Sequence, residues 1–135
     1  MDGVTLTPLK RIHNPKGDIF HAMKRSDAGF DEFGEAYFST VHKGDIKGWK
    51  KHTKMTLNIV VPIGEIEFVI YNEDTKDFFS LKLSNNNYQR MTIKPNLWMA
   101  FRGIAKNNML LNLASLEHDP SESIDCDLEK IKYEW

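Results

Sequence analysis

The chain has little cysteine, little excess charge and no long apolar run. Its single cysteine, Cys126, cannot form a disulfide within the chain, and the acidic residues on either side of it disfavour a nucleophilic thiolate. A formal net charge of -1 argues against nucleic acid as a partner. The longest apolar-rich run, residues 57–63, is too short to span a bilayer, and residues 1–5 lack the apolar region of a secretory signal. We therefore expect a cytoplasmic protein with no membrane partner.

What the chain has instead is a succession of short strand patterns separated by Gly, Pro, Asn and Asp. Its 135 residues, 41% of them hydrophobic, suit one globular domain, residues 1–135. Short helices are predicted only at 26–33 or around 120–123. Many strands and few helices favour an all-β antiparallel sandwich or jelly roll. The predicted strands are 5–12, 18–23, 35–41, 46–52, 55–61, 65–71, 78–83, 88–93, 97–101 and 109–116.

Residues 46–52, Ile-Lys-Gly-Trp-Lys-Lys-His, concentrate basic groups in one of these strands. If side chains alternate along it, Lys50 and His52 share one face, while Lys47 and Trp49 lie on the other. A lysine and a histidine on one barrel wall would suit proton transfer or the binding of an anion. A basic edge strand, protected by lysine against pairing with another sheet, has the same pattern.

The same region excludes the usual metal site of a double-stranded β-helix. That site needs two histidines one residue apart, then a glutamate, with a glycine after a fixed gap. With the glycine at Gly64, the second histidine is His52, but the first falls on Lys50 and the acid near Leu57. A protonated lysine does not bind metal. We predict no bound transition metal.

Several short motifs stand out along the chain. They are Gly-Glu-Ala-Tyr-Phe-Ser (34–39), Ile-Lys-Gly-Trp-Lys (46–50), Met-Thr-Leu-Asn (55–58), Trp-Met-Ala-Phe-Arg-Gly (98–103), His-Asp-Pro (118–120) and Tyr-Glu-Trp (133–135). These motifs resemble the deoxysugar-nucleotide 3,5-epimerase family, whose type member acts on dTDP-4-keto-6-deoxyglucose, and above all a shorter branch of that family. The resemblance implies a cupin-type jelly roll and a homodimer that uses no cofactor. It also implies a nucleotide-sugar substrate and a role in deoxysugar biosynthesis for polysaccharides or other glycans.

The resemblance also assigns candidate catalytic residues, although at several of these positions the chain has a different residue from the family. The family's histidine base falls at Lys50 and its enolate-stabilising arginine at Lys47. Its tyrosine acid falls near Asn112, which is no ordinary general acid, and Asp127 is the candidate for the acid that orients the base. Lys50 would have to lose its proton to act as the base. Neighbouring positive charge would favour that loss, and an ion pair with Asp127 would oppose it.

Within the enzyme class, His52 is the alternative base. Imidazole has a suitable proton affinity near neutral pH, and a Lys50 ammonium beside it would stabilise an enolate oxygen. A surface histidine on a polar strand is the competing interpretation.

Candidate substrate-binding residues are Phe20, Tyr37 and Trp98, whose rings would stack on a base or line a sugar pocket, together with Glu35 and Asn112. Aromatic residues of small β-proteins more often fill the core or a dimer seam. The remaining acidic residues near the C-terminus are expected to form a solvated segment (Glu117, Asp119, Glu122 and Asp125).

Three functions stay open on this basis. The first is an isomerase or epimerase of a nucleotide-linked keto-sugar that abstracts a proton next to the carbonyl. The second is a relative that binds a sugar nucleotide or carbohydrate and has lost catalysis. The third is an enzyme of another reaction type, such as a lyase or ketoisomerase, in the same pocket.

Overall fold

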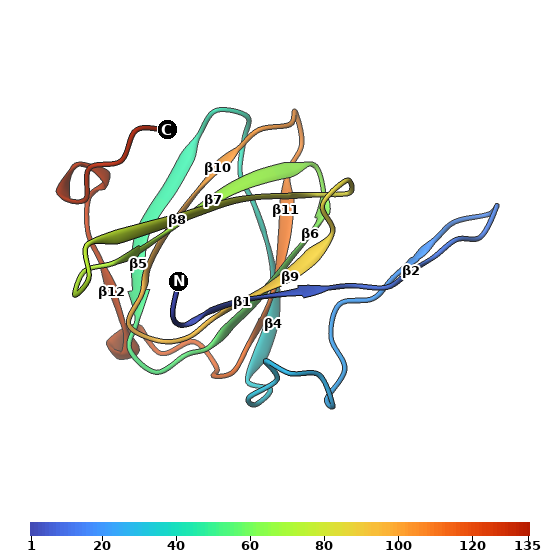
Figure 1. Ribbon diagram of the computed structural model, residues 1–135, viewed down its shortest axis with the longest axis horizontal. Helices are drawn as coiled ribbons and strands as arrows, with labels where there is room; N and C mark the ends of the chain where they lie inside the picture. Colours follow the sequence, from blue (N-terminus) through green and yellow to red (C-terminus); the bar gives the residue numbers. More distant parts are fainter.

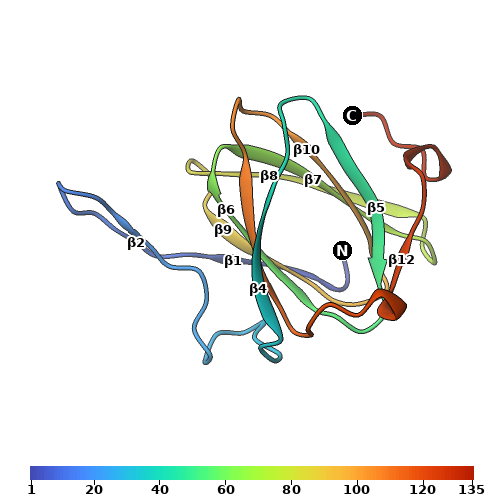
Figure 2. The same ribbon diagram turned by 180° about the vertical axis from the view of Figure 1, so that it is seen from behind.

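The computed structural model describes residues 1–135, and ten of the strands form two five-stranded antiparallel sheets that face each other (Figures 1 and 2). The sheet orders are β1-β9-β6-β11-β4 and β12-β5-β10-β7-β8, and β2 pairs only with β3. This is the predicted all-β jelly roll. The strands are Val4–Pro8 (β1), Arg11–Ile12 (β2), Ile19–Phe20 (β3), Glu35–Thr40 (β4), Ile46–His52 (β5), Leu57–Ile63 (β6), Glu65–Asn72 (β7), Asp77–Ser84 (β8), Gln89–Ile93 (β9), Trp98–Gly103 (β10), Met109–Ala114 (β11) and Ser123–Asp125 (β12).

From residue 35 to residue 114 the predicted strands are confirmed to within two residues. The prediction was wrong nearer the N-terminus, where the strand expected at 5–12 is broken into β1 and β2. Pro8 ends β1, because proline has no N–H to continue a ladder. No helix forms at 26–33. The buried Arg90 instead donates hydrogen bonds to the carbonyls of Ala22 and Ala28, which holds this loop against the sheet.

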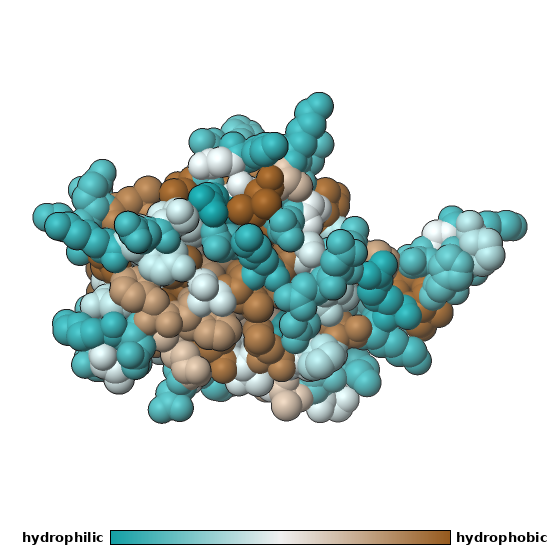
Figure 3. Space-filling model, turned by 45° about the horizontal axis from the view of Figure 1, so that its top comes forward, coloured by the Kyte–Doolittle hydropathy of each residue, from teal (hydrophilic) through white to brown (hydrophobic).

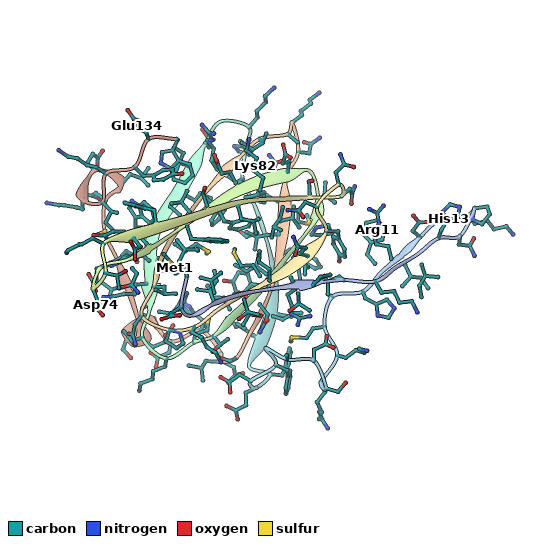
Figure 4. The ribbon with its side chains drawn as sticks, in the orientation of Figure 1. Met1, Arg11, His13, Asp74, Lys82 and Glu134 are labelled. Atoms are coloured by element: carbon teal, nitrogen blue, oxygen red, sulfur yellow. The ribbon has the colours of Figure 1, made fainter.

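Strands β2 and β3 form a hairpin arm that projects from the barrel (Figures 1 and 2). Figure 4 shows His13 far out on this arm and Arg11 nearer the body of the molecule, where its guanidinium donates a hydrogen bond to the carbonyl of Asn85. On the face drawn in Figure 3, apolar side chains gather over the centre, and hydrophilic ones cover the tip of the arm.

Side-chain alternation along the strands builds the main core between the sheets. On β8, Leu83 is buried and Phe79 and Leu81 pack against the core from the same face, as predicted. On β7 the alternation gives way to residues buried on both faces, because Val69 packs outside the barrel into a second cluster. That cluster contains Trp49 and Trp98.

The C-terminal segment covers the second cluster. Asp119 caps a 3₁₀ turn, η1 (Pro120–Glu122), which confirms the short helix expected at this place. Strand β12 then pairs with β5, an addition to the sheet that was not predicted, and a second 3₁₀ turn, η2 (Leu128–Lys130), follows. The aromatic rings of Tyr133 and Trp135 pack against each other and against the cluster. None of the helical segments has the length and apolar character needed to cross a membrane.

Candidate active site

A cavity of about 770 Å³ opens between the two sheets. Its walls come from strands of both sheets and from the segment that follows β12. A cavity of this size falls in the range typical of small-molecule sites. The lining residues are Tyr37, Ser39, Lys47, Gly48, Trp49, Lys50, His52, Leu57, Ile59, Met99, Phe101, Leu110, Asn112, Asp125, Cys126, Asp127, Leu128 and Glu129.

His52 and Glu122 form a hydrogen-bonded pair at this cavity. Glu122 lies in η1, 70 residues along the chain, and its side chain is only 3% exposed. One carboxylate oxygen contacts His52 Nδ1. The other accepts hydrogen bonds from the backbone N–H groups of Lys54 and Met55 at 3.1 and 3.2 Å. The expectation that Glu122 is solvated was therefore wrong. It is buried because these three donors satisfy its charge.

The surroundings of Glu122 decide its protonation and, through it, the state of the imidazole. Burial acts to raise the pKa of Glu122, but the hydrogen bonds from His52, Lys54 and Met55 together hold that pKa below its ordinary value. An ionised carboxylate at Nδ1 keeps the proton of a neutral imidazole on Nδ1. The lone pair of Nε2, which has no hydrogen-bond partner within the protein, is then free to accept a proton from a molecule in the cavity.

Strand β5 brings Lys47 to the same cavity as Lys50 and His52. The simple alternation that placed Lys47 on the other face was wrong. Met99 on β10 pairs with Lys50 on β5, and Phe101 pairs with Lys47. Two steps along β10 therefore correspond to three steps along β5, so β5 has one extra residue at this point. Such a bulge changes which side chains face inward.

Gly48 lies within this bulge, and its backbone has a φ of +149°. A Cβ placed on it would lie 2.5 Å from the Cβ of Ala100 and 2.7 Å from its Cα. Only glycine lets β5 and β10 approach this closely in that conformation.

The two lysines of the cavity are held in different ways. Lys47 Nζ donates hydrogen bonds to Ser39 Oγ and to the carbonyl of Thr40, at 3.0 and 3.2 Å. Lys50 Nζ lies 3.3 Å from the carboxylate of Asp125 on β12. Asp127 lines the cavity as well, but it is Asp125 that pairs with Lys50 and Glu122 that contacts His52.

Tyr37 and Asn112 line the wall of the cavity that belongs to the other sheet. They are directly opposite each other in the ladder between β4 and β11. Asn112 is buried, and its Nδ2 donates a hydrogen bond of 3.0 Å to Tyr37 Oη. The cavity therefore presents an imidazole and the ammonium of Lys50 on one wall and a phenol on the other, and the ammonium of Lys47 reaches across to β4.

The family model of the WxcM-like, C-terminal domain (FdtA) matches residues 2–132 of the chain. The chain belongs to this family. No curated protein matches its sequence. Among solved structures, this WxcM-like chain is similar to a dTDP sugar isomerase from Desulfovibrio desulfuricans G20. The TM-score is 0.93 at 28% identity, over 99% of this chain and 91% of the other.

Two further solved structures share the fold at lower identity. The sugar 3,4-ketoisomerase QdtA from Thermoanaerobacterium thermosaccharolyticum, in complex with TDP, has a TM-score of 0.82 at 22% identity, over 97% of this chain and 93% of QdtA. The epimerase RmlC from Legionella pneumophila, in complex with dTDP-4-keto-L-rhamnose, has a TM-score of 0.85 at 15% identity, over all of this chain and 79% of RmlC. The chain is homologous to dTDP-sugar isomerases and has the cupin-type fold of RmlC.

Three candidate residues of this WxcM-like chain lie outside the cavity. Phe20 belongs to the hairpin arm, where its ring packs on Tyr88 at 5.2 Å between centroids. Glu35 begins β4 and pairs with Ala114 in the ladder. Trp98 is buried in the second cluster. The other candidates, Lys47, Lys50, His52, Asp127, Tyr37 and Asn112, all line the cavity.

Glu122 is the residue that sequence reasoning missed at this site. The local signal was present, since Asp119 and Pro120 predict a short helical turn that contains Glu122. No spacing in the sequence links that turn to His52, because the contact joins elements 70 residues apart.

Proposed function

We propose that this protein is a metal-independent isomerase of a nucleotide-linked keto-deoxysugar, and that it acts by abstracting a proton from a carbon next to the carbonyl. The observation that carries the proposal is the pair of His52 and Glu122 at a substrate-sized cavity. Homology to dTDP-sugar isomerases supports a dTDP-linked substrate and a place in deoxysugar biosynthesis. The proposed step uses only side chains of the protein.

His52 is a better base than Lys50 in this arrangement. A lysine must lose its proton before it can act as a base, and Lys50 Nζ forms an ion pair with the carboxylate of Asp125 at 3.3 Å. Glu122 fixes the tautomer of His52, and no group of the protein forms a hydrogen bond to Nε2 of His52.

In the proposed step, Nε2 of His52 takes the proton from the carbon. The electron pair of the broken C–H bond forms a C=C bond, and the carbonyl oxygen becomes an enolate oxygen. Lys47 and Lys50 line the same cavity, and their ammonium groups would stabilise that negative charge. Return of a proton to carbon then gives the isomer. Return to the same carbon on the opposite face is epimerisation. In ketoisomerisation the proton instead returns to the former carbonyl carbon, while the hydroxyl on the carbon that lost its proton gives its O–H proton to the enolate oxygen and becomes the new carbonyl.

The substrate class can be tested by calorimetry with dTDP-, UDP-, GDP- and CDP-linked sugars, followed by incubation of dTDP-4-keto-6-deoxyglucose with the protein and proton NMR of the product. We expect binding of the dTDP-sugar and conversion to an isomer whose stereochemistry separates the two reactions. Binding without conversion would instead support the alternative of a receptor that has lost catalysis. Binding of none of the nucleotides would refute the proposal.

We also propose that the protein is a homodimer, as the family resemblance implies. Light scattering coupled to size-exclusion chromatography should give twice the 15.7 kDa of one chain. A mass equal to one chain would contradict this.

A further inference from the structure

The phenol of Tyr37 is held by hydrogen bonds whose direction can be worked out from the buried groups behind it. Asn112 Oδ1 accepts a hydrogen bond from the backbone N–H of Asn58 at 3.1 Å. A backbone N–H can only donate, so the oxygen of the Asn112 amide must face Asn58. The amide nitrogen of Asn112 must then face Tyr37, and its N–H donates to Tyr37 Oη at 3.0 Å.

This arrangement is rigid. Asn112 is 1% exposed and Asn58 is 2% exposed. The side chain of Asn58 is itself fixed, because its Oδ1 accepts from Arg90 Nε and Thr92 Oγ1. A rotation of the Asn112 amide would place its NH₂ group against the N–H of Asn58 and leave two buried donors unpaired, at a cost of about 1–3 kcal/mol each.

The consequence concerns the proton of Tyr37. Since Oη accepts from Asn112, that contact does not use the O–H of the phenol. Oη has no other hydrogen-bond partner within the protein, and Tyr37 lines the cavity. The hydroxyl is therefore directed as a donor toward a molecule in the cavity.

The position of Tyr37 relative to His52 suits a substrate held between them. Tyr37 is on β4 of one sheet, whereas His52 is on β5 of the other, and both line the same cavity. A sugar bound between the sheets would therefore meet a base on one wall and a hydroxyl donor on the other.

We propose that Tyr37 is the hydrogen-bond and proton donor to the substrate oxygen that becomes negative in the reaction, and that Asn112 is its positioning residue. This rests on the proposed function. As His52 removes the proton from carbon, the O–H of Tyr37 donates to the enolate oxygen. If the proton transfers, the products are an enol and a phenolate, and the N–H of Asn112 stabilises the phenolate. The phenolate recovers the same proton when the carbonyl forms again.

The test is steady-state kinetics on Tyr37→Phe, with Tyr71→Phe as the matched control, since Tyr71 lies on β7 and outside the cavity. Loss of a donor to a developing oxyanion lowers kcat by about 10²-fold. We expect that fall in Tyr37→Phe with KM nearly unchanged, and wild-type kinetics in Tyr71→Phe. A kcat equal to that of the wild type in Tyr37→Phe would overturn the proposal.

Asn112→Asp tests the direction of the hydrogen bond with almost no change in shape. Its carboxylate still accepts from Asn58, but in its ionised form it also accepts the O–H of Tyr37 and withdraws it from the cavity. In its protonated form it can donate to Oη as asparagine does. We expect kcat of Asn112→Asp to fall as rising pH ionises the new carboxyl group. The wild type should show no fall in kcat over the same pH range. The double variant with Tyr37→Phe should show no such new dependence.

A pH profile of Asn112→Asp that matches the wild type would overturn the positioning role. If that variant does not fold by circular dichroism, Tyr37→Phe still decides the donor role, because it leaves the amide of Asn112 in place. A different experiment tests the proposed function. A His52→Asn variant with wild-type turnover would refute His52 as the base, whatever the result with Tyr37→Phe.

Discussion

Replacing Glu122 with glutamine should invert the tautomer of His52 while preserving the shape of the site. The carboxylate accepts from two backbone N–H groups through one oxygen and contacts His52 Nδ1 through the other. The glutamine oxygen is needed by the two backbone donors. Its NH₂ group therefore faces His52, and Nδ1 must become the acceptor. The proton of a neutral imidazole then lies on Nε2, which can no longer accept a proton from substrate.

Glu122→Gln should lose both general base catalysis by His52 and the charge-assisted hydrogen bonds of the carboxylate. General base catalysis contributes typically about 10²–10⁴-fold, so kcat should fall within that range. The charge-assisted hydrogen bonds of a buried carboxylate contribute about 1.5–3 kcal/mol, and the variant should be less stable by a similar amount. For a domain of this length that corresponds to a fall in Tm of roughly 5–10 °C.

Steady-state kinetics and thermal denaturation of Glu122→Gln measure both effects. Glu117→Gln is the matched control, because Glu117 is exposed near the same turn and makes no hydrogen bond through its side chain. Its kcat and Tm should equal those of the wild type. A Glu122→Gln variant with wild-type kcat would refute the argument that Glu122 sets the tautomer of the base.

Two further predictions concern stability. The pKa of Glu122 lies below its unfolded value of 4.5, so its ionisation stabilises the fold above that pH, and this contribution is lost as pH falls through the folded pKa. Thermal denaturation should show the Tm difference between wild type and Glu122→Gln narrowing below pH 4.5, and a difference independent of pH would contradict the assignment. Gly48→Ala should lower the free energy of unfolding by about 1–3 kcal/mol, because its Cβ would lie 2.5 Å from that of Ala100 in a strained backbone region. Urea denaturation measures this change, with Gly44→Ala as a comparison that also has a positive φ but has no atom within 4 Å of the added Cβ. Equal losses of unfolding free energy in the two variants would show that the close packing of β10 against Gly48 is not the cause of the destabilisation.

Much of the fold could be predicted because strands with one buried face alternate in the sequence. Phe79, Leu81 and Leu83 identify the inner face of β8 without any tertiary information. The expected end of the first strand was wrong because Pro8 lies inside a run of otherwise strand-like residues. The helix expected after Ser26 does not form because the loop there is tied to Arg90, a residue more than 60 positions away.

The candidate site was only partly predictable for a similar reason. His52, Lys50 and Lys47 are close in the sequence, so they could be singled out together, but the bulge that brings all three to one cavity depends on how β10 pairs with β5. Glu122 looked like one of several solvated acidic residues. Only the fold of the C-terminal segment shows that it is buried against His52.

The most direct test of the account is the exchange of substrate hydrogen with solvent. Wild-type protein, His52→Asn and the matched control His42→Asn would each be incubated with dTDP-4-keto-6-deoxyglucose in deuterium oxide, and the signal of the proton next to the carbonyl followed by NMR. His42 is exposed and does not line the cavity. Asparagine at position 52 keeps an N–H for Glu122 but has no basic nitrogen. We predict exchange in the wild type and in His42→Asn, and its loss in His52→Asn. Exchange at the wild-type rate in His52→Asn would contradict it.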